Sequence, residues 1–320
     1  MLGWIRGPGE LLSYQRTMRT RPLLLLLLLF IPASLARFPA DAVKVPYVST
    51  KSYYYRPLGH QTSTDDVLVA CLASKPELFF PDSSSGSRGV ERYLDLGCGV
   101  GSTLLLVHHN TRPTLSVGIE GQAVSYAMLS QTVRELPDGE GAGIQVIHGD
   151  LREAVPALLA ESSFDLITAN PPFSKQYSGG HCKDDQRTFA RFEMRGGVED
   201  YCMCAAKLLR PGGRFVLAFW HKEDGLTRVQ RASCAAGLRV VRRVDVLAGK
   251  STNTEPHISI FELELDNNNF VHGGGNVQTT TTLDVRRDAS NRLSRTYKEI
   301  QERLEMRPRP LKPTIGKSGA

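Results

Sequence analysis

The chain has 320 residues, of which 41% are hydrophobic and 22% are charged, and its formal net charge is +6. This composition excludes a disordered or fibrous protein and allows one large α/β core or two small domains. The positive charge suits a partner that carries phosphates, but residues 1–37 and 286–320 hold most of the surplus, so the middle of the chain is nearly neutral.

Residues 1–44 are expected to form a targeting leader. The apolar run 23–31 is too short to span a bilayer but has the length of a signal-peptide core, and Ser34-Leu35-Ala36 offers a small-x-small cleavage pattern. The arginine-rich, acid-poor start is typical of a mitochondrial or plastid transit peptide. We therefore expect an organelle, plastid or mitochondrion, with secretion and a cytoplasmic location as alternatives, and no stable membrane partner after processing.

The six cysteines contain no CxxC pair, and a chain of this length does not need disulfides to fold, so reduced thiols are expected. A zinc site built from His181, Cys182, Cys202 and Cys204 would match no common ligand spacing. No metal is therefore expected.

A helix is predicted after a short extended segment that follows the leader. Ser63 or Thr64 is the expected N-cap, and Asp65 and Asp66 favour the first helical turn. Residues 81–89 are a loop by composition.

Strands and helices alternate from residue 91 onward. The predicted strands are 91–97, 115–120, 144–150, 164–170, 214–220, 238–248 and 257–265, with helices between most of them. This alternation predicts an α/β fold, in which a seven-stranded, mostly parallel sheet carries helices on both faces. The last strand alternates polar and apolar residues, as an antiparallel edge strand would. The domain is expected to span residues 45–266.

Residues 267–320 are expected to be a flexible basic extension with a short helix. Residues 267–282 have low complexity, whereas Leu293, Tyr297, Ile300 and Leu304 fall on one helical stripe. The basic end of the chain is interpreted as a solvated tail in preference to a docking arm.

Ligands of open parallel sheets bind beyond the carboxyl ends of the strands. The first predicted strand ends with Asp95, which precedes Gly97, Gly99 and Gly101. These glycines let the backbone approach a ligand at the N-terminus of the next helix. The spacing GxGxG differs from the GxGxxG of dinucleotide-binding folds, so it disfavours NAD.

Acidic residues end the next two predicted strands. Glu120 is placed to accept hydrogen bonds from both hydroxyls of a ribose, with a surface glutamate as the alternative. Asp150 could accept a hydrogen bond from the amine of an adenine, or it could cap the helix that follows.

The fourth of these strands ends in Asn170, Pro171, Pro172 and Phe173. Proline fixes φ, lacks an N–H group and keeps the preceding residue out of the helical region, so these residues form a stiff corner. The corner presents an amide, a carbonyl and an aromatic ring. Simple termination of the strand is the alternative for such a short motif.

Together these motifs resemble the class I S-adenosylmethionine-dependent methyltransferases, which have a Rossmann-like fold. The NPPF motif resembles that of the members that methylate adenine N6, guanine N2 or a glutamine amide. The segments TSTDDVLVACLA and ARFEMRGGVEDYCMCAAKLLRPGGRFVLAF are similar to the bacterial tRNA-valine adenine-N6 methyltransferase family, and this similarity covers residues 57–265.

The resemblance implies that S-adenosylmethionine is the cofactor and that tRNA is the partner. It implies that Asp65, or its neighbour Asp66, stands near the cofactor, that Asp95 and Glu120 hold it, and that residues 170–173 are catalytic. Phe173 departs from the tyrosine common in this family and also occurs in guanine-N2 enzymes.

Residues 174–195 form a polar insertion in which Lys175 and Arg191 are expected to bind substrate phosphates. The leading hypothesis is an adenine-N6 methyltransferase acting on tRNA. The alternatives are methylation of guanine N2 in rRNA, of DNA adenine or of a protein glutamine, an NAD-dependent oxidoreductase, and a non-catalytic RNA-binding protein.

Overall fold

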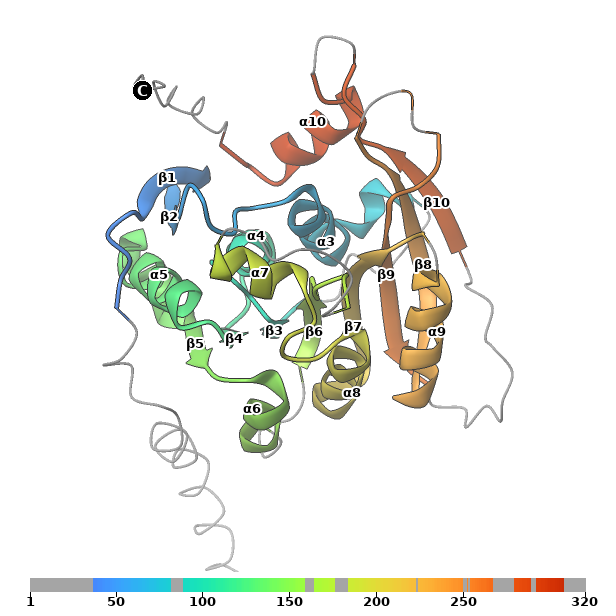
Figure 1. The fold of residues 1–320 in the computed structure, drawn as a ribbon, viewed down its shortest axis with the longest axis horizontal. Coiled ribbons are helices and arrows are strands. Elements are labelled where there is room, and N and C mark those ends of the chain that lie inside the picture. Colours follow the sequence, from blue (N-terminus) through green and yellow to red (C-terminus); the bar gives the residue numbers. More distant parts are fainter. Residues whose placement is uncertain are drawn as a thin grey trace, which may run out of the picture.

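The computed structural model describes residues 37–81, 89–158, 164–175, 184–222, 224–249, 252, 254–266, 279–288 and 292–307. Within them, one sheet of eight strands forms the centre of the fold (Figure 1). Its strands are β3 (Arg92–Leu96), β4 (Leu115–Glu120), β5 (Ile144–His148), β6 (Phe164–Ala169), β7 (Leu209–Trp220), β8 (Leu238–Leu247), β9 (Ile258–Leu265) and β10 (Thr279–Asp284). Their order is β10-β8-β9-β7-β6-β3-β4-β5.

Strands β5, β4, β3, β6 and β7 are parallel neighbours, so the prediction of a mostly parallel α/β sheet is confirmed. Strand β9 is antiparallel as expected, but it is not an edge strand, because it pairs with both β7 and β8. Two of its polar side chains are buried: Ser259 donates a hydrogen bond to Asp245, and Glu262 lies between two arginines. The alternating pattern therefore reflects polar partners within the sheet.

Strand β10 corrects the expectation of flexibility for residues 279–282, the part of the low-complexity segment that the structure describes. Its run of threonines pairs in parallel with β8, and Thr281 lies opposite Val244. Threonine is β-branched and favours extended backbone. The sheet therefore continues beyond residue 266, the predicted end of the domain, and β10 forms one of its edges.

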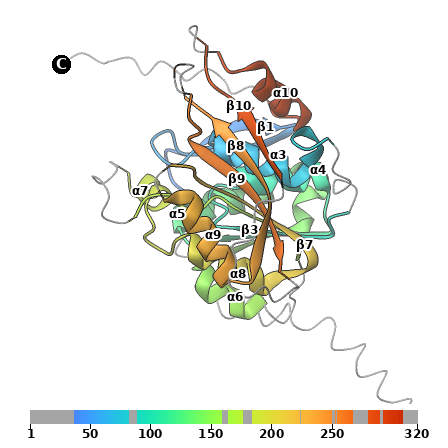
Figure 2. The same ribbon diagram turned by 90° about the vertical axis from the view of Figure 1, so that its right-hand side faces the viewer.

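Helices cover both faces of the sheet (Figure 2). The helices are α3 (Thr64–Ser74), α4 (Ser102–Thr111), α5 (Ala123–Arg134), α6 (Leu151–Leu158), α7 (Asp185–Arg191), α8 (Val198–Leu208), α9 (Gly225–Ala235) and α10 (Arg295–Arg303). Two short 3₁₀ helices are η3 (Pro76–Leu78) and η5 (Pro137–Gly143). Helices α3, α4 and α5 pack on one face, and α6, α8 and α9 pack on the other.

Successive side chains of β7 enter opposite cores, as the two-residue period of a strand requires. Val216 and Ala218 join the core beneath α3 and α4, whereas Phe215, Leu217 and Phe219 join the core beneath α8 and α9. Both faces of this strand are thus apolar and buried.

The N-terminal hairpin consists of β1 (Val43–Val48) and β2 (Lys51–Tyr55). The leader predicted at 1–44 lies mostly outside the described residues, and β1 already begins at its last two positions. Among the described helices, none is long and apolar enough to cross a membrane.

The C-terminal segment packs against this hairpin. Helix α10 buries Tyr297 and Ile300, and the residues after it run beside β1, where Met306 pairs with Val48. The Arg307 N–H donates a hydrogen bond to the Tyr47 carbonyl at 2.7 Å. These residues are therefore part of the folded unit.

Candidate active site

A cavity of about 310 Å³ lies beyond the carboxyl ends of β3, β4 and β6. It brings together most of the side chains singled out in the sequence: Asp65, Asp95, Gly97, Gly99, Glu120, Asp150, Asn170, Pro171, Pro172, Phe173 and Arg191. Two expected residues do not line it. Gly101 is the N-cap of α4, and Lys175 lines a separate cavity next to α8 and α9.

Lys175, expected to bind substrate phosphates, does not line the cavity of the catalytic corner. The preceding residue, Ser174, still lines the cavity, and its N–H donates a hydrogen bond to the Arg191 carbonyl at 3.1 Å. The exposed Lys175 side chain then lies near Glu199 and Arg228. Arg191 remains at the cavity.

The loop after β3 has left-handed backbone at Gly97, Gly99 and Gly101, with φ of +69°, +57° and +90°. A Cβ on Gly97 would lie 2.6 Å from the Tyr201 hydroxyl, so no larger residue fits without displacing that side chain. The left-handed region is also costly for residues with a Cβ. These two constraints explain the choice of glycine, and Gly97 and Gly99 line the cavity that a ligand would occupy.

Glu120 holds the glycine loop in place. Its buried carboxylate accepts hydrogen bonds from the Gly99 N–H at 2.8 Å and from the Gln122 N–H at 2.6 Å. Burial raises the pKa of this carboxyl, while the two backbone donors oppose the increase. It is not a surface glutamate, and its remaining lone pairs face a cavity that a ribose could occupy.

Asp95 is 2% exposed and has one unsatisfied oxygen. Its Oδ1 accepts a hydrogen bond from the Thr168 hydroxyl at 2.7 Å, whereas Oδ2 has no hydrogen-bond partner among the described residues. Burial raises the pKa of the carboxyl from 3.8 to about 8. A buried acceptor without a partner, at the wall of a cavity, fits a ligand that carries a cationic or N–H donor.

Asp150 caps α6, which was one of its two predicted roles. Its carboxylate accepts a hydrogen bond from the Arg152 N–H at 2.9 Å and pairs with the Arg152 guanidinium, which lowers its pKa. It lines the cavity as well, so capping does not remove it from reach of a ligand.

Asn170 is oriented by Asp66, a residue named only as an alternative to Asp65 in the sequence. The Asn170 Nδ2 donates a hydrogen bond to Asp66 Oδ1 at 2.7 Å, and Asp66 Oδ2 accepts one from the Ser63 N–H at 2.8 Å. A carboxylate only accepts, so the amide nitrogen must face Asp66. The Asn170 Oδ1 is left as the acceptor that this side chain can present to a ligand.

Asp65 also lines the cavity beside Asp66. Burial, followed by the charge of Asp66, raises its pKa from 3.8 to about 7. The sequence signal for both residues was the acidic first turn of α3, but only the fold shows that Asp66 contacts Asn170.

Phe173 and Trp220 form an aromatic corner of the cavity. The ring of Phe173 packs edge-on against Phe219, and its centroid lies 6.1 Å from that of Trp220 with a 50° angle between the planes. Trp220 was not predicted as a site residue. The available signal was an aromatic residue at the end of the strand next to the one that precedes Asn170.

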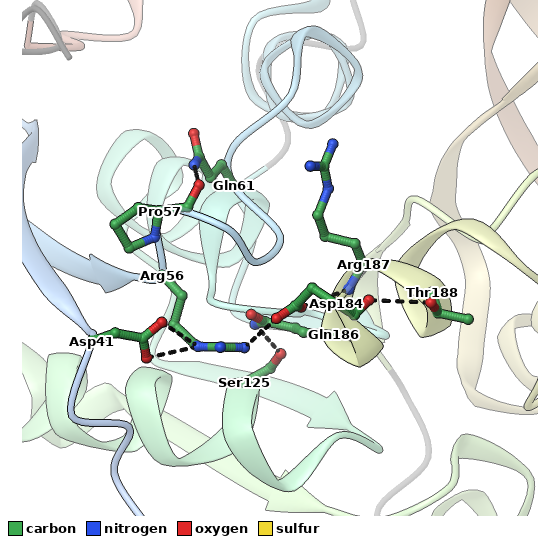
Figure 3. Close-up of polar contacts among 9 residues, drawn as sticks. All are labelled: Asp41, Arg56, Pro57, Gln61, Ser125, Asp184, Gln186, Arg187 and Thr188. Carbon is green, nitrogen blue, oxygen red and sulfur yellow. Dashed lines mark hydrogen bonds and ion pairs between the residues drawn. The ribbon is translucent and has the colours of Figure 1, made fainter. Parts of the chain in front are cut away.

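Helix α7, which forms one wall of the cavity, is fixed by a polar cluster (Figure 3). Arg56 lies between Asp41 and Asp184, with N–O distances of 2.9 Å to each, and Asp184 is the N-cap of α7. In the same cluster the buried Gln186 donates a hydrogen bond to Ser125 of α5 at 2.8 Å.

These contacts hold the cavity residues on and after α7. Phe189 and Arg191 belong to the helix, and the Arg195 guanidinium stacks over the Phe189 ring at 4.5 Å. Arg191 and Arg195 are exposed, so two cations stand at the edge of a cavity whose deeper residues are acidic.

Among the described residues, no three His, Cys, Asp or Glu side chains are grouped to hold a metal ion. Cys202 and Cys204 are free and buried. His181 and Cys182, considered as zinc ligands, lie outside the described residues.

Residues 83–189 match the methyltransferase small domain. The match includes the glycine loop, Glu120, Asp150 and the corner at 170–173, and it confirms the resemblance seen in these motifs. Comparison with curated proteins also finds methyltransferases. A protein of Porphyromonas gingivalis named tRNA1(Val) (adenine(37)-N6)-methyltransferase is 30% identical over 158 residues, which cover 49% of this chain and 57% of that protein.

A protein of the same name from Mannheimia succiniciproducens is 30% identical over 127 residues, which cover 39% of this chain and 50% of the relative. The chain thus spans only about half the length of these curated relatives. Among solved structures, a predicted O-methyltransferase of Agrobacterium tumefaciens has a TM-score of 0.49 at 16% identity, covering 75% of this chain and 96% of that one.

S-adenosylmethionine is the cofactor that the match to the methyltransferase small domain indicates, and the residues of the cavity fit it. The unpaired Asp95 Oδ2 suits a cationic or N–H donor, and Glu120 suits the hydroxyls of a ribose. Gly97 and Gly99 of the glycine loop line the same cavity.

Proposed function

We propose that the chain is an S-adenosylmethionine-dependent N-methyltransferase that methylates N6 of adenine in tRNA. One observation supports the reaction type: Asn170 lines the same cavity as the glycine loop. Its amide nitrogen donates a hydrogen bond to Asp66, so its amide oxygen is available to accept a hydrogen bond from a substrate amine. The substrate class rests on the motif resemblance and on the names of the curated relatives.

The chain's own residues would hold the cofactor in a defined orientation. Glu120 would accept hydrogen bonds from the ribose hydroxyls, Asp150 from the adenine amine and Asp95 Oδ2 from the amino-acid end. Asp65 adds a further carboxyl near the catalytic corner. When bound, the cofactor supplies an electrophilic methyl group, so the protein contributes position and electrostatics.

The amine of adenine is a weak nucleophile because its lone pair is delocalised into the ring. Asn170 Oδ1 and the Pro171 carbonyl would accept hydrogen bonds from its two N–H groups and favour a tetrahedral nitrogen. With the amine held by these two acceptors, a bound cofactor would supply the methyl group to the nitrogen, and the amine would lose one N–H proton to water. The two prolines keep the acceptors from relaxing away from this geometry.

The substrate must leave its own stack to reach this corner. Phe173 would stack on the displaced base, and Arg191 at the cavity edge would bind a neighbouring phosphate. We keep Lys175 as a more distant phosphate contact, since it lies in the adjoining cavity. The predicted leader leads us to propose that this tRNA is organellar.

Methyl transfer from labelled S-adenosylmethionine tests the proposal. The full chain is incubated with separate pools of tRNA, rRNA, DNA and protein, and the products are digested to nucleosides or amino acids. We expect the label in tRNA as N6-methyladenosine, and its absence with Asn170→Ala. Label in guanine, DNA or glutamine would replace the proposed substrate, and cofactor binding without transfer to any pool would contradict an enzymatic role.

A further inference from the structure

Trp220 stands at the substrate end of the cavity although no sequence motif marks it. It is the last residue of β7, and β7 pairs in parallel with β6, so that Leu217 lies opposite Ala169. The catalytic corner begins one residue after Ala169. Because these two strands are neighbours, their carboxyl ends place the Trp220 indole beside the catalytic corner. Trp220 and residues 170–173 line the same cavity.

The indole is supported from outside the cavity. His257, which does not line the cavity, packs on Trp220 with ring centroids 4.5 Å apart, and the backbone N–H of His257 donates a hydrogen bond to the Val246 carbonyl. Burial lowers the pKa of His257, which favours the neutral ring. A half-buried tryptophan held in this way presents a large rigid surface at little entropic cost.

The two aromatic rings of the corner are not parallel. Phe173 and Trp220 have centroids 6.1 Å apart and planes inclined by 50°, so nothing planar fits between them as a sandwich. A planar group that stacks on one ring must instead meet the other at an angle. The pair thus forms two adjoining walls of a corner that suits a flat ring system.

We propose that Trp220 is a specificity-determining residue that contacts the target base, and this inference rests on the proposed methyl transfer. The base stacks in the corner formed by Phe173 and Trp220 while its amine meets Asn170. Stacking on an aromatic ring favours a planar nucleobase over the flexible side chain of a glutamine. Trp220 therefore selects a nucleic-acid substrate over a protein one.

Intrinsic fluorescence tests this contact without any methyl transfer. The chain has two tryptophans, Trp4 and Trp220, so a Trp4→Phe protein reports on Trp220 alone. It is titrated, with S-adenosylhomocysteine present, with a short unpaired RNA that has a central adenine and with the same RNA lacking that base. We expect stronger quenching by the RNA with adenine, and equal quenching by the two would overturn the inference.

Kinetics give the second readout. Trp220→Ala should raise the KM for the adenine RNA about tenfold, the effect expected for one lost base–aromatic stack, whereas Trp220→Phe should raise it less than about threefold. Both variants should retain the affinity for S-adenosylhomocysteine within about twofold, and Trp220→Phe should retain the melting temperature better than Trp220→Ala, which removes a half-buried indole packed on His257. Phe38→Ala removes an aromatic ring that is 44% exposed and outside the cavity, and it serves as the matched control.

The possible results separate the inference from the proposed function. An unchanged KM in Trp220→Ala, in a protein that methylates RNA, would refute the contact and leave the reaction in place. Adenine-dependent quenching without transfer to RNA would support the contact and contradict the reaction. Transfer to a protein glutamine, with no adenine-dependent quenching, would contradict both.

Discussion

Replacing Asn170 by alanine removes one of the two acceptors proposed for the substrate amine. A single preorganised hydrogen-bonding group in such a site contributes about 2.7–4 kcal/mol to the transition state, or about 10²–10³ in kcat. Since Asn170 is not placed to hold the cofactor, we expect the affinity for S-adenosylhomocysteine to change less than about twofold.

The same substitution should also affect stability through Asp66. Asp66 is 5% exposed, and its Oδ1 would lose the 2.7 Å hydrogen bond from Asn170. Leaving a buried acceptor unpaired costs about 1–3 kcal/mol, which corresponds to a decrease of several degrees in melting temperature. Asp66→Ala removes the orphaned group, so the double variant should lose less stability than the sum of the single ones.

Four proteins are compared: the unaltered chain, Asn170→Ala, Asp66→Ala and the double variant. Labelled methyl transfer gives their kcat and KM, calorimetry gives their affinity for S-adenosylhomocysteine, and thermal unfolding gives their stability. The stability cycle should return a coupling of about 1.5–3 kcal/mol for the hydrogen bond to the charged carboxylate. A kcat for Asn170→Ala within about threefold of the unaltered protein would refute the assignment of the corner.

Three further predictions follow from the site. The pKa of Asp95 is about 8 in the folded protein and 3.8 when unperturbed, so its ionisation opposes folding. The melting temperature of the free protein should therefore fall as pH rises from about 4 to 8, and it should fall less in Asp95→Asn, while the affinity for S-adenosylhomocysteine, whose amino-acid end Asp95 would hold, rises. Arg56→Ala should loosen α7 and raise the KM for RNA severalfold, which corresponds to a loss of about 1 kcal/mol in the free energy of RNA binding. Arg292→Ala removes an exposed ion pair outside the cavity and should leave this KM unchanged. Gly97→Ala should cost stability and cofactor affinity, measured by unfolding and calorimetry; Gly237→Ala has a similar φ of +74° and no atom within 4 Å of the added Cβ, so it should cost only stability, about 1–2 kcal/mol.

Much of the site could be predicted because parallel strands end at the same edge of a sheet. That rule brought Asp95, Glu120, Asp150 and Asn170 together from positions far apart in the chain. The positive φ of the glycines also follows from residue type. These features depend on local chemistry and on the direction of the strands alone.

Contacts between side chains from distant segments could not be predicted in this way. The hydrogen bond from Asn170 to Asp66 joins residues 104 positions apart, and its existence depends on how α3 lies against the sheet. The burial of Glu262 likewise depends on the strands that flank β9, and the position of Lys175 in a separate cavity depends on where α8 and α9 pack. Side-chain contacts of this kind depend on how the elements pack, and the periodicity of the sequence does not determine that packing.

The C-terminal segment has a practical consequence for preparing shortened proteins. Its pairing with β1 supports Tyr47, and the Tyr47 hydroxyl in turn donates a hydrogen bond to the Ser102 carbonyl at the start of α4, directly after the glycine loop. A truncation at residue 266 would strip away β10, α10 and this support together. A version trimmed for crystallisation should keep every residue through Arg307, and an affinity tag belongs beyond that point.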